Sequence, residues 1–291
     1  FVGQGYVAET LSDFTAYIGA MNQVLNGGNI EITGSFHGHT KASGILLFNE
    51  GLLTNATNLG NIRQENFIRS ASKEVASAGI IYANLGKNAM VKDVLNSGEI
   101  TAISKTTQGF AHASGIVVRN DIFENHTFIT SGSLNRHQKI TFAVNQGSVY
   151  AWSEDATLIT IDQESKSKAS GILTIGMSSL INVINYGDIH SKYVASGIIG
   201  FLHLNRFGAL PSYPSLYFGN MMNYGRIREI TAFTYDFSIN NDANPTRTVQ
   251  NAFGAIFGKF HSNATSLENT NYTNGWTFLS VGTTGNKYTL D

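Results

Sequence analysis

Residues 42–62 read Ala-Ser-Gly-Ile-Leu-Leu-Phe-Asn-Glu-Gly-Leu-Leu-Thr-Asn-Ala-Thr-Asn-Leu-Gly-Asn-Ile and contain both motifs that decide the fold. The first motif, Ala-Ser-Gly-Ile, begins at Ala42, and the second, Asn-x-Gly-x-Ile/Val, begins at Asn58. The first recurs at 113–116, 169–172 and 195–198, with variants at 77–80 and 252–256; the second recurs at Asn26, Asn96, Asn145, Asn185 and Asn223. The two motifs alternate strictly along the chain, and this regularity predicts a repeat protein.

The spacing of the motifs indicates which kind of repeat this is. From the glycine of one motif to the glycine of the next, the early steps are 16, 16, 19, 19 and 17 residues. Such a unit is too short for helical-hairpin repeats or propeller blades, but it suits one coil of a parallel β-helix. We therefore expect an all-β solenoid, a right-handed parallel β-helix of about 12 coils, with loop insertions and a length of roughly 55 Å.

The local pattern around each motif agrees with short strands joined by tight corners. Apolar runs such as Ile45–Phe48 and Ile116–Val118 follow the first motif and are too short for helices. A corner needs a positive φ or a close backbone approach, which Gly permits, and Asn tolerates the left-handed region. Asn side chains at equivalent corners are expected to stack as a hydrogen-bonded ladder. The repeated Asn, Gly, Ser and Ala are therefore interpreted as scaffold.

The composition of the 291-residue chain fits this interpretation and excludes two function classes. There are 29 Asn and 30 Gly but only 3 Pro, and charged residues make up 13%, against about 25% in typical domains. Pro is disfavoured because it would remove donors from the strand ladders. A formal net charge of -1 argues against nucleic-acid binding through a basic surface. No apolar run approaches the ~18 residues of a membrane span, so this segment is not expected to insert directly into a membrane.

Three regions are expected along the chain. Residues 1–25 are expected to form an N-terminal helical cap, because Leu11, Phe14, Met21 and Leu25 recur at helical spacing. Residues 26–260 form the β-solenoid. Residues 261–291 lack the clean motifs and are expected to form a C-terminal coil, a cap or a linker.

Four insertions interrupt the coil period, at about 121–139, 151–168, 203–220 and 231–250. Insertions in solenoids project from one face and often carry binding residues. Two of them concentrate aromatic side chains, and exposed aromatic loops are typical of protein or sugar contacts. The candidate partner-binding residues are Arg206, Phe207, Tyr213, Tyr217, Phe218, Phe233 and Tyr235. The alternative is that these loops only cover the flank of the solenoid.

The sequence contains no convincing catalytic, cofactor-binding or metal-binding constellation. Gly3-Gln4-Gly5 imitates part of a dinucleotide fingerprint but lacks the preceding strand that this chemistry requires. His37 and His39 could share one strand face, but two ligands without a nearby Cys or carboxylate make a poor zinc site. We therefore expect no catalytic residues, no cofactor and no bound metal, and the chain is predicted not to be an enzyme.

The alternating motifs resemble the short-repeat β-solenoids of bacterial surface proteins, in particular GLUG-motif repeats and autotransporter passenger domains. In the GLUG pattern, Gly-Gly precedes an apolar pair and Asn follows it. Here Ala-Ser-Gly precedes Ile45-Leu46, and Asn49 follows. The resemblance covers about residues 26–260 and implies an extracellular or cell-surface location, with a role as adhesin, stalk or toxin-like passenger.

Three functions are compatible with these observations. The first is a non-catalytic extracellular surface module that binds a host protein or glycan through its inserted loops. The second is a polysaccharide-degrading β-helix enzyme, a lyase or hydrolase, which predicts acidic residues of several coils aligned in one groove. The third is a structural stalk segment of a larger secreted protein or toxin.

Overall fold

The computed structural model describes residues 19–67, 74–85, 89–105, 109–120, 138–154, 167–176, 178–203, 217–230, 252–261 and 279–280. These residues form four parallel sheets, which we call A to D, and contain no helix. Sheet A contains β1 (Ala20–Asn26), β5 (Leu52–Asn58), β9 (Met90–Asn96), β13 (Lys139–Asn145), β17 (Ser179–Asn185), β21 (Phe218–Asn223) and β25 (Leu279–Ser280). Sheet B contains β2 (Ile30–Gly34), β6 (Ile62–Asn66), β10 (Ile100–Ser104), β14 (Val149–Ser153), β18 (Ile189–Ser191) and β22 (Ile227–Glu229).

The other two sheets complete each turn of the chain. Sheet C contains β3 (Thr40–Ser43), β7 (Glu74–Ala78), β11 (Phe110–Ser114), β15 (Ser167–Ser170), β19 (Val194–Ser196) and β23 (Ala252–Gly254). Sheet D contains β4 (Leu46–Asn49), β8 (Ile81–Asn84), β12 (Val117–Asn120), β16 (Leu173–Gly176), β20 (Ile199–His203) and β24 (Phe257–His261). The chain passes through A, B, C and D in order and then returns to A, so the predicted parallel β-helix is confirmed.

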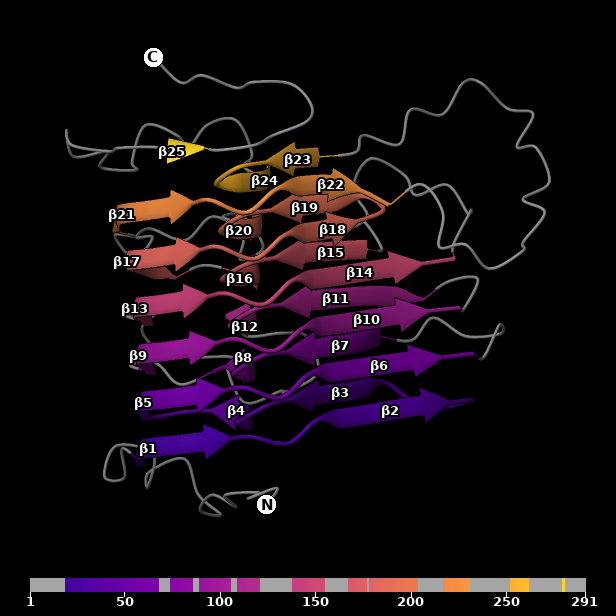
Figure 1. Ribbon diagram of the computed structural model, residues 1–291, viewed down its shortest axis with the longest axis horizontal. Helices are drawn as coiled ribbons and strands as arrows, with labels where there is room; N and C mark the ends of the chain where they lie inside the picture. The colour runs from indigo at the N-terminus through magenta and orange to yellow at the C-terminus, as the bar shows by residue number, and fades with distance from the viewer. Residues whose placement is uncertain are drawn as a thin grey trace, which may run out of the picture.

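Figure 1 shows how the coils stack. Strands of sheets A and B run from left to right in front, strands of C and D return behind them, and each new coil lies above the last, so the coil is right-handed. β25 pairs with β21, with Ser280 opposite Asn223, and therefore begins a seventh coil within the segment that we expected to be a coil, cap or linker.

The predicted number of coils was wrong. Four strands make one coil, so the described strands form six coils, and at about 4.8 Å per coil the solenoid is roughly 29 Å long rather than 55 Å. The error arose because both motifs lie on the same coil. The Asn-x-Gly motif connects sheets A and B and the Ala-Ser-Gly motif connects C and D, so one motif-to-motif step is half a coil.

The lengths of the four connections explain where insertions occur. The A-to-B connection has three residues and the C-to-D connection has two residues in all six coils. The four predicted insertions fall on the other two corners: 121–139 and 203–220 span connections from D to A, and 151–168 and 231–250 span connections from B to C, although the ends of the first three lie in strands. Length variation is therefore confined to the corners that carry no motif.

The two motif corners meet inside the coil and form a waist. The Asn column from Asn26 to Asn223 is the predicted ladder: each Nδ2 donates to the Oδ1 of the next coil at 2.7–2.8 Å. The same Nδ2 atoms also donate to the carbonyl of the motif glycine. Across the coil, the Ala-Ser-Gly glycines press on this ladder, and a Cβ on Gly79 would collide with Asn96.

The motif glycines are needed because the backbone of the next coil approaches closely. The positive φ that we expected as a second reason for glycine at these corners does not occur. Among the described glycines only Gly176 has a positive φ. A Cβ at Gly98 would instead collide with the carbonyl oxygen of Gly60, the same position one coil earlier. Because successive coils stack at strand spacing, the position of Gly98 has no room for a side chain.

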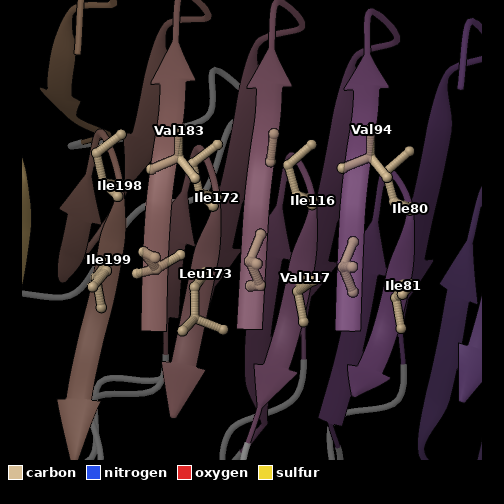
Figure 2. Close-up of a cluster of buried hydrophobic side chains, with 14 of the residues drawn as sticks. Ile80, Ile81, Val94, Ile116, Val117, Ile172, Leu173, Val183, Ile198 and Ile199 are labelled. Atoms are coloured by element: carbon tan, nitrogen blue, oxygen red, sulfur yellow. The ribbon is translucent and has the colours of Figure 1, made fainter. Parts of the chain in front are cut away.

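The waist divides the interior into two hydrophobic cores. One core lies between sheets A and D and contains large side chains such as Ile80, Ile116, Val94 and Val183, which point toward one another in Figure 2. The other lies between sheets B and C and is rich in alanine, such as Ala102, Ala151 and Ala169. Smaller side chains let sheets B and C approach more closely than sheets A and D.

A column of left-handed residues shapes sheet A. Gln23, Asn55, Asp93, Phe142, Asn182 and Asn220 occupy equivalent positions and have φ of 52–58°. This residue shifts the inside–outside alternation by one, so that Leu53 and Ala56, three residues apart, both face the core. Asn and Asp tolerate this conformation best, whereas a bulky Phe is an outlier there.

The expected N-terminal helix does not extend to residue 25. Met21 and Leu25 lie in β1, which pairs with β5 from Ala20 onward, so the solenoid starts before residue 26. Backbone pairing along a sheet edge prevails over the helical spacing of these apolar residues. Leu11 and Phe14 lie outside the described residues. In the part of the chain that the structure describes, no helix is long and apolar enough to span a membrane.

Candidate functional site

Two of the seven predicted partner-binding residues are described, and they lie in different environments. Arg206, Phe207, Tyr213, Phe233 and Tyr235 lie outside the described residues. Tyr217 directly precedes β21, is 50% exposed, and its N–H donates to Ser179 Oγ at 3.0 Å.

The assignment of Phe218 to an exposed loop was wrong. Phe218 is the first residue of β21, lies opposite Leu180 in sheet A and is 7% exposed. Its ring packs edge-on against Phe257 of sheet D, with the centroids 5.8 Å apart. Strand alternation turns it into the A–D core while the preceding Tyr217 stays outside.

Exposed aromatic side chains gather along sheet A in coils four to six. Phe142 in β13, Tyr186 just after β17, Tyr217 just before β21 and Tyr224 just after β21 expose 50%, 50%, 50% and 38%. The rings of Tyr186 and Tyr224 stack with centroids 5.1 Å apart and planes 9° apart. We call these four residues the aromatic face.

The equivalent positions in the first three coils are different. Leu59 and Ser97 precede Tyr186 and Tyr224 in the same column, and Asn55 and Asp93 precede Phe142 in theirs. The aromatic face therefore does not follow from the repeat and is specific to coils four to six. Among the described residues of sheet A, coils one to three have no exposed aromatic side chain.

Sheet B and the connections at its two ends carry further aromatic and charged side chains. The rings of Tyr150 and His190 stack 4.6 Å apart, and Lys192 Nζ lies 5.8 Å from the Trp152 ring centroid. Arg226 donates two hydrogen bonds to Asp188 Oδ2, at 2.7 and 3.0 Å. Burial lowers the pKa of Lys192, against the opposing effect of a nearby carboxylate.

A second group of side chains, which the sequence analysis did not find, lies on sheets C and D. We call Lys41, Glu74, Tyr82, His112, Arg119 and Lys168 the charged cluster. Glu74 is its centre: it accepts a hydrogen bond from Tyr82 Oη at 2.8 Å, and its Oε1 lies 2.9 Å from His112 Nδ1 and 3.3 Å from Arg119 Nε. Lys41 Nζ lies 4.5 Å from the Tyr82 ring centroid.

The charges in this cluster strongly perturb one another. Burial alone would raise the pKa of the Glu74 carboxyl, but Arg119, His112 and Lys41 outweigh burial and hold it well below its usual range. Burial and the nearby charges of Lys168 and Arg119 lower the pKa of His112 to about 4, although Glu74 opposes this shift. His112 is therefore neutral and Glu74 ionised at neutral pH.

The evident role of the charged cluster is in packing. Glu74 exposes 7% and His112 1%, so neither presents a reacting atom to solvent. Each of the first four coils contributes different groups, from Lys41 in the first to Lys168 in the fourth. Because the Asn and Gly columns are alike in every coil, such unlike partners distinguish the correct stacking order from a slipped one.

The sequence did contain a signal for this cluster. Lys41, His112 and Lys168 each stand directly before an Ala-Ser-Gly motif, and they occupy one column of sheet C. The same repeat position in three coils is charged or titratable, and this pattern predicts that the three side chains share one column. Glu74 and Arg119 do not stand directly before an Ala-Ser-Gly motif, so the sequence does not indicate that they belong to the cluster.

The remaining candidates from the sequence have structural surroundings. His39 Nδ1 accepts a hydrogen bond from the Glu74 N–H at 3.1 Å, and neither His37 nor His39 lies in a strand. Across the described ranges, no three His, Cys, Asp or Glu side chains come together as a metal site would require.

Comparison with known proteins gives no family assignment. No family model, curated protein or solved structure matches the chain.

Proposed function

We propose that this chain is a non-catalytic binding module of a cell-surface or secreted protein, in which the solenoid holds the aromatic face as its recognition surface. The observation that carries the proposal is the exposure of four aromatic side chains along sheet A, Phe142, Tyr186, Tyr217 and Tyr224, each at least 38% exposed, with the rings of Tyr186 and Tyr224 stacked. Aromatic residues are enriched at the centres of interfaces, and grouped exposed ones mark interaction sites.

The backbone at Phe142 supports the same proposal. Phe142 has a φ of 52° in a column where the other residues are Gln, Asn, Asn, Asn and Asp. In this conformation a bulky side chain causes more backbone strain than Asn, and such local strain is concentrated at functional sites. An exposed Phe in this conformation is therefore consistent with a side chain that is needed for contact.

The extracellular or cell-surface location is part of the proposal. It is supported by the short alternating motifs, by the low content of charged residues and by the rigidity of stacked coils, which suits display of a binding surface. Host proteins and glycans are the two classes of partner that aromatic surfaces fit.

The proposal is tested by binding of the purified chain to glycan arrays and to panels of extracellular proteins. A Tyr186→Ala/Tyr224→Ala variant is expected to lose at least tenfold in affinity, about 1.4 kcal/mol. Leu59→Ala is the matched control, because Leu59 is 53% exposed in the same column of the second coil. Equal binding by the double variant and the wild-type chain would contradict the proposal.

A further inference from the structure

Tyr217 is held as a platform on the surface of sheet A. A Cβ placed on Gly219 would lie 3.0 Å from Tyr217 Cε1 and 3.4 Å from Tyr217 Oη, so the ring lies across the place where a side chain would stand. The Tyr217 N–H is also fixed by Ser179 Oγ at 3.0 Å. With half of its surface exposed, the ring therefore offers an open side to solvent.

Two surface amides stand beside this platform. Asn220, next to Gly219, donates from Nδ2 to Asn182 Oδ1 at 2.8 Å. Within the described part of the chain, Asn182 Nδ2 and Asn220 Oδ1 make no further hydrogen bond, which leaves a donor and an acceptor for a ligand. The φ values of 56° and 52° fix both residues in the left-handed column.

The two strands that carry this platform are uncharged, and the nearest charged residue in the Tyr217 column is Lys139 of β13, two coils earlier. β17 reads Ser-Leu-Ile-Asn-Val-Ile-Asn and β21 reads Phe-Gly-Asn-Met-Met-Asn, with no ionisable side chain in either strand. An aromatic ring face is electron-rich and attracts the C–H groups of a sugar ring, which carry partial positive charge. Amide donors and acceptors match sugar hydroxyls, and their number and placement give specificity.

We propose that Tyr217, Asn182 and Asn220 form a subsite for an uncharged sugar ring of a glycan, stacked on Tyr217 and hydrogen-bonded to the two amides. This inference rests on the proposed binding function and names the chemical class of its ligand. A polyanion would find no cation on β17 or β21, so neutral glycans are favoured over acidic ones.

The test uses the full chain and an array of neutral oligosaccharides of glucose, galactose, mannose and N-acetylglucosamine, followed by saturation-transfer NMR on the sugars that bind. The wild-type chain is expected to bind at least one of them. Tyr217→Phe keeps the ring and should stay within about threefold, whereas Tyr217→Ala should lose at least tenfold. Binding of no neutral oligosaccharide, or full affinity in Tyr217→Ala, overturns the proposal.

A second variant keeps the test decisive if Tyr217→Ala does not fold. Asn220→Gly removes the amide but retains the left-handed backbone at no steric cost. It should weaken sugar binding about tenfold, and its matched control is Asn55→Gly, at the same column position in the second coil, which also loses an amide–amide bond. Equal affinities of the two Gly variants would contradict the subsite.

The outcomes separate this inference from the broader proposal. Binding of a protein or an acidic glycan that depends on Tyr186 and Tyr224, without neutral-sugar binding, overturns the sugar subsite and leaves the binding function standing. Sugar binding that is lost in Tyr217→Ala but unchanged in the Tyr186→Ala/Tyr224→Ala variant supports the subsite and contradicts the proposal that the whole aromatic face is the recognition surface.

Discussion

The waist of the solenoid and its aromatic face follow opposite rules. At the waist the same Asn and Gly recur in coil after coil, and each Asn bonds its equivalent at 2.7–2.8 Å. On the aromatic face the residue type changes along the column: Tyr186 and Tyr224 follow Leu59, Ser97 and Gln146. Positions that repeat maintain the stacking, and positions that depart from the repeat are free to serve recognition.

The two regions nevertheless touch along the chain. Asn185 is fully buried, whereas Tyr186, the next residue, is 50% exposed. Substitutions at such neighbours should separate stability from binding.

The largest effect is expected at a waist glycine. Gly98→Ala places a Cβ against the carbonyl oxygen of Gly60, and stacked backbone on both sides cannot move away. We expect a loss of more than about 4 kcal/mol, which abolishes the folded state. Urea unfolding followed by circular dichroism measures this effect. Gly38→Ala is the control, because nothing lies within 4 Å of a Cβ there; equal stability of the two variants would contradict the account.

A smaller loss is expected in the ladder itself. Asn145→Ala removes the bonds to Asn185 and Gly147 and leaves Asn96 Nδ2 without its ladder acceptor. Leaving buried polar groups unsatisfied costs about 1–3 kcal/mol each, so we expect a loss of roughly 2–4 kcal/mol. Asn26→Ala, at the partly exposed end of the ladder, should cost about 1 kcal/mol. Equal losses in the two variants would show that burial of the amide does not set the cost of breaking the ladder.

The charged cluster predicts acid sensitivity. The pKa of His112 falls from 6.5 when unfolded to about 4 when folded, so the unfolded state binds more protons between these values. Stability is therefore complete above about pH 6.5 and declines as pH falls toward 4, by on the order of 3 kcal/mol. Glu74, whose pKa is also lowered, adds a further loss below its unfolded pKa of 4.5.

Unfolding free energies of His112→Gln measured from pH 7 to pH 4 check this prediction. The variant should show a flatter pH dependence in that window, because the titrating group is gone. His37→Gln is the control, since His37 is exposed and lies outside the charged cluster. An unchanged slope in His112→Gln would show that other groups cause the acid sensitivity.

The smallest expected effect on stability is a gain. Phe142→Asn puts a residue that tolerates a positive φ into the left-handed column, and should stabilise the chain by about 0.5–1 kcal/mol. The same change removes one member of the aromatic face and should weaken ligand binding. Thermal unfolding and ligand binding measured on one preparation give both results. An increase in both stability and affinity would show that Phe142 is not part of the recognition surface.

The sequence predicted the fold well because the ladder and the glycine corners depend on residue identity alone. It misjudged the number of coils, since spacing shows how often a motif recurs but not whether two motifs lie on opposite sides of one coil. Asn96 and Gly79 are 17 residues apart and meet at the waist. This contact depends on the path of the chain through the intervening strands, which the spacing alone does not predict.

The candidate site was less predictable. Tyr217 and Phe218 are neighbours with similar side chains, and only the start of β21 decides that one faces solvent and the other the core. Tyr186 and Tyr224 occupy position x of Asn-x-Gly, which differs from coil to coil and for which the motif predicts no role. The charged cluster gathers residues from 41 to 168 that no local pattern joins.

The most direct test of the account compares Asn185→Ala with Tyr186→Ala in parallel measurements of urea unfolding and ligand binding. Asn185→Ala should lower the unfolding free energy by roughly 2–4 kcal/mol while the remaining folded protein binds normally. Tyr186→Ala should leave stability within about 0.5 kcal/mol and reduce binding severalfold. The reverse assignment, or equal loss of stability in both variants, would contradict the division between a repeating scaffold and a non-repeating recognition face.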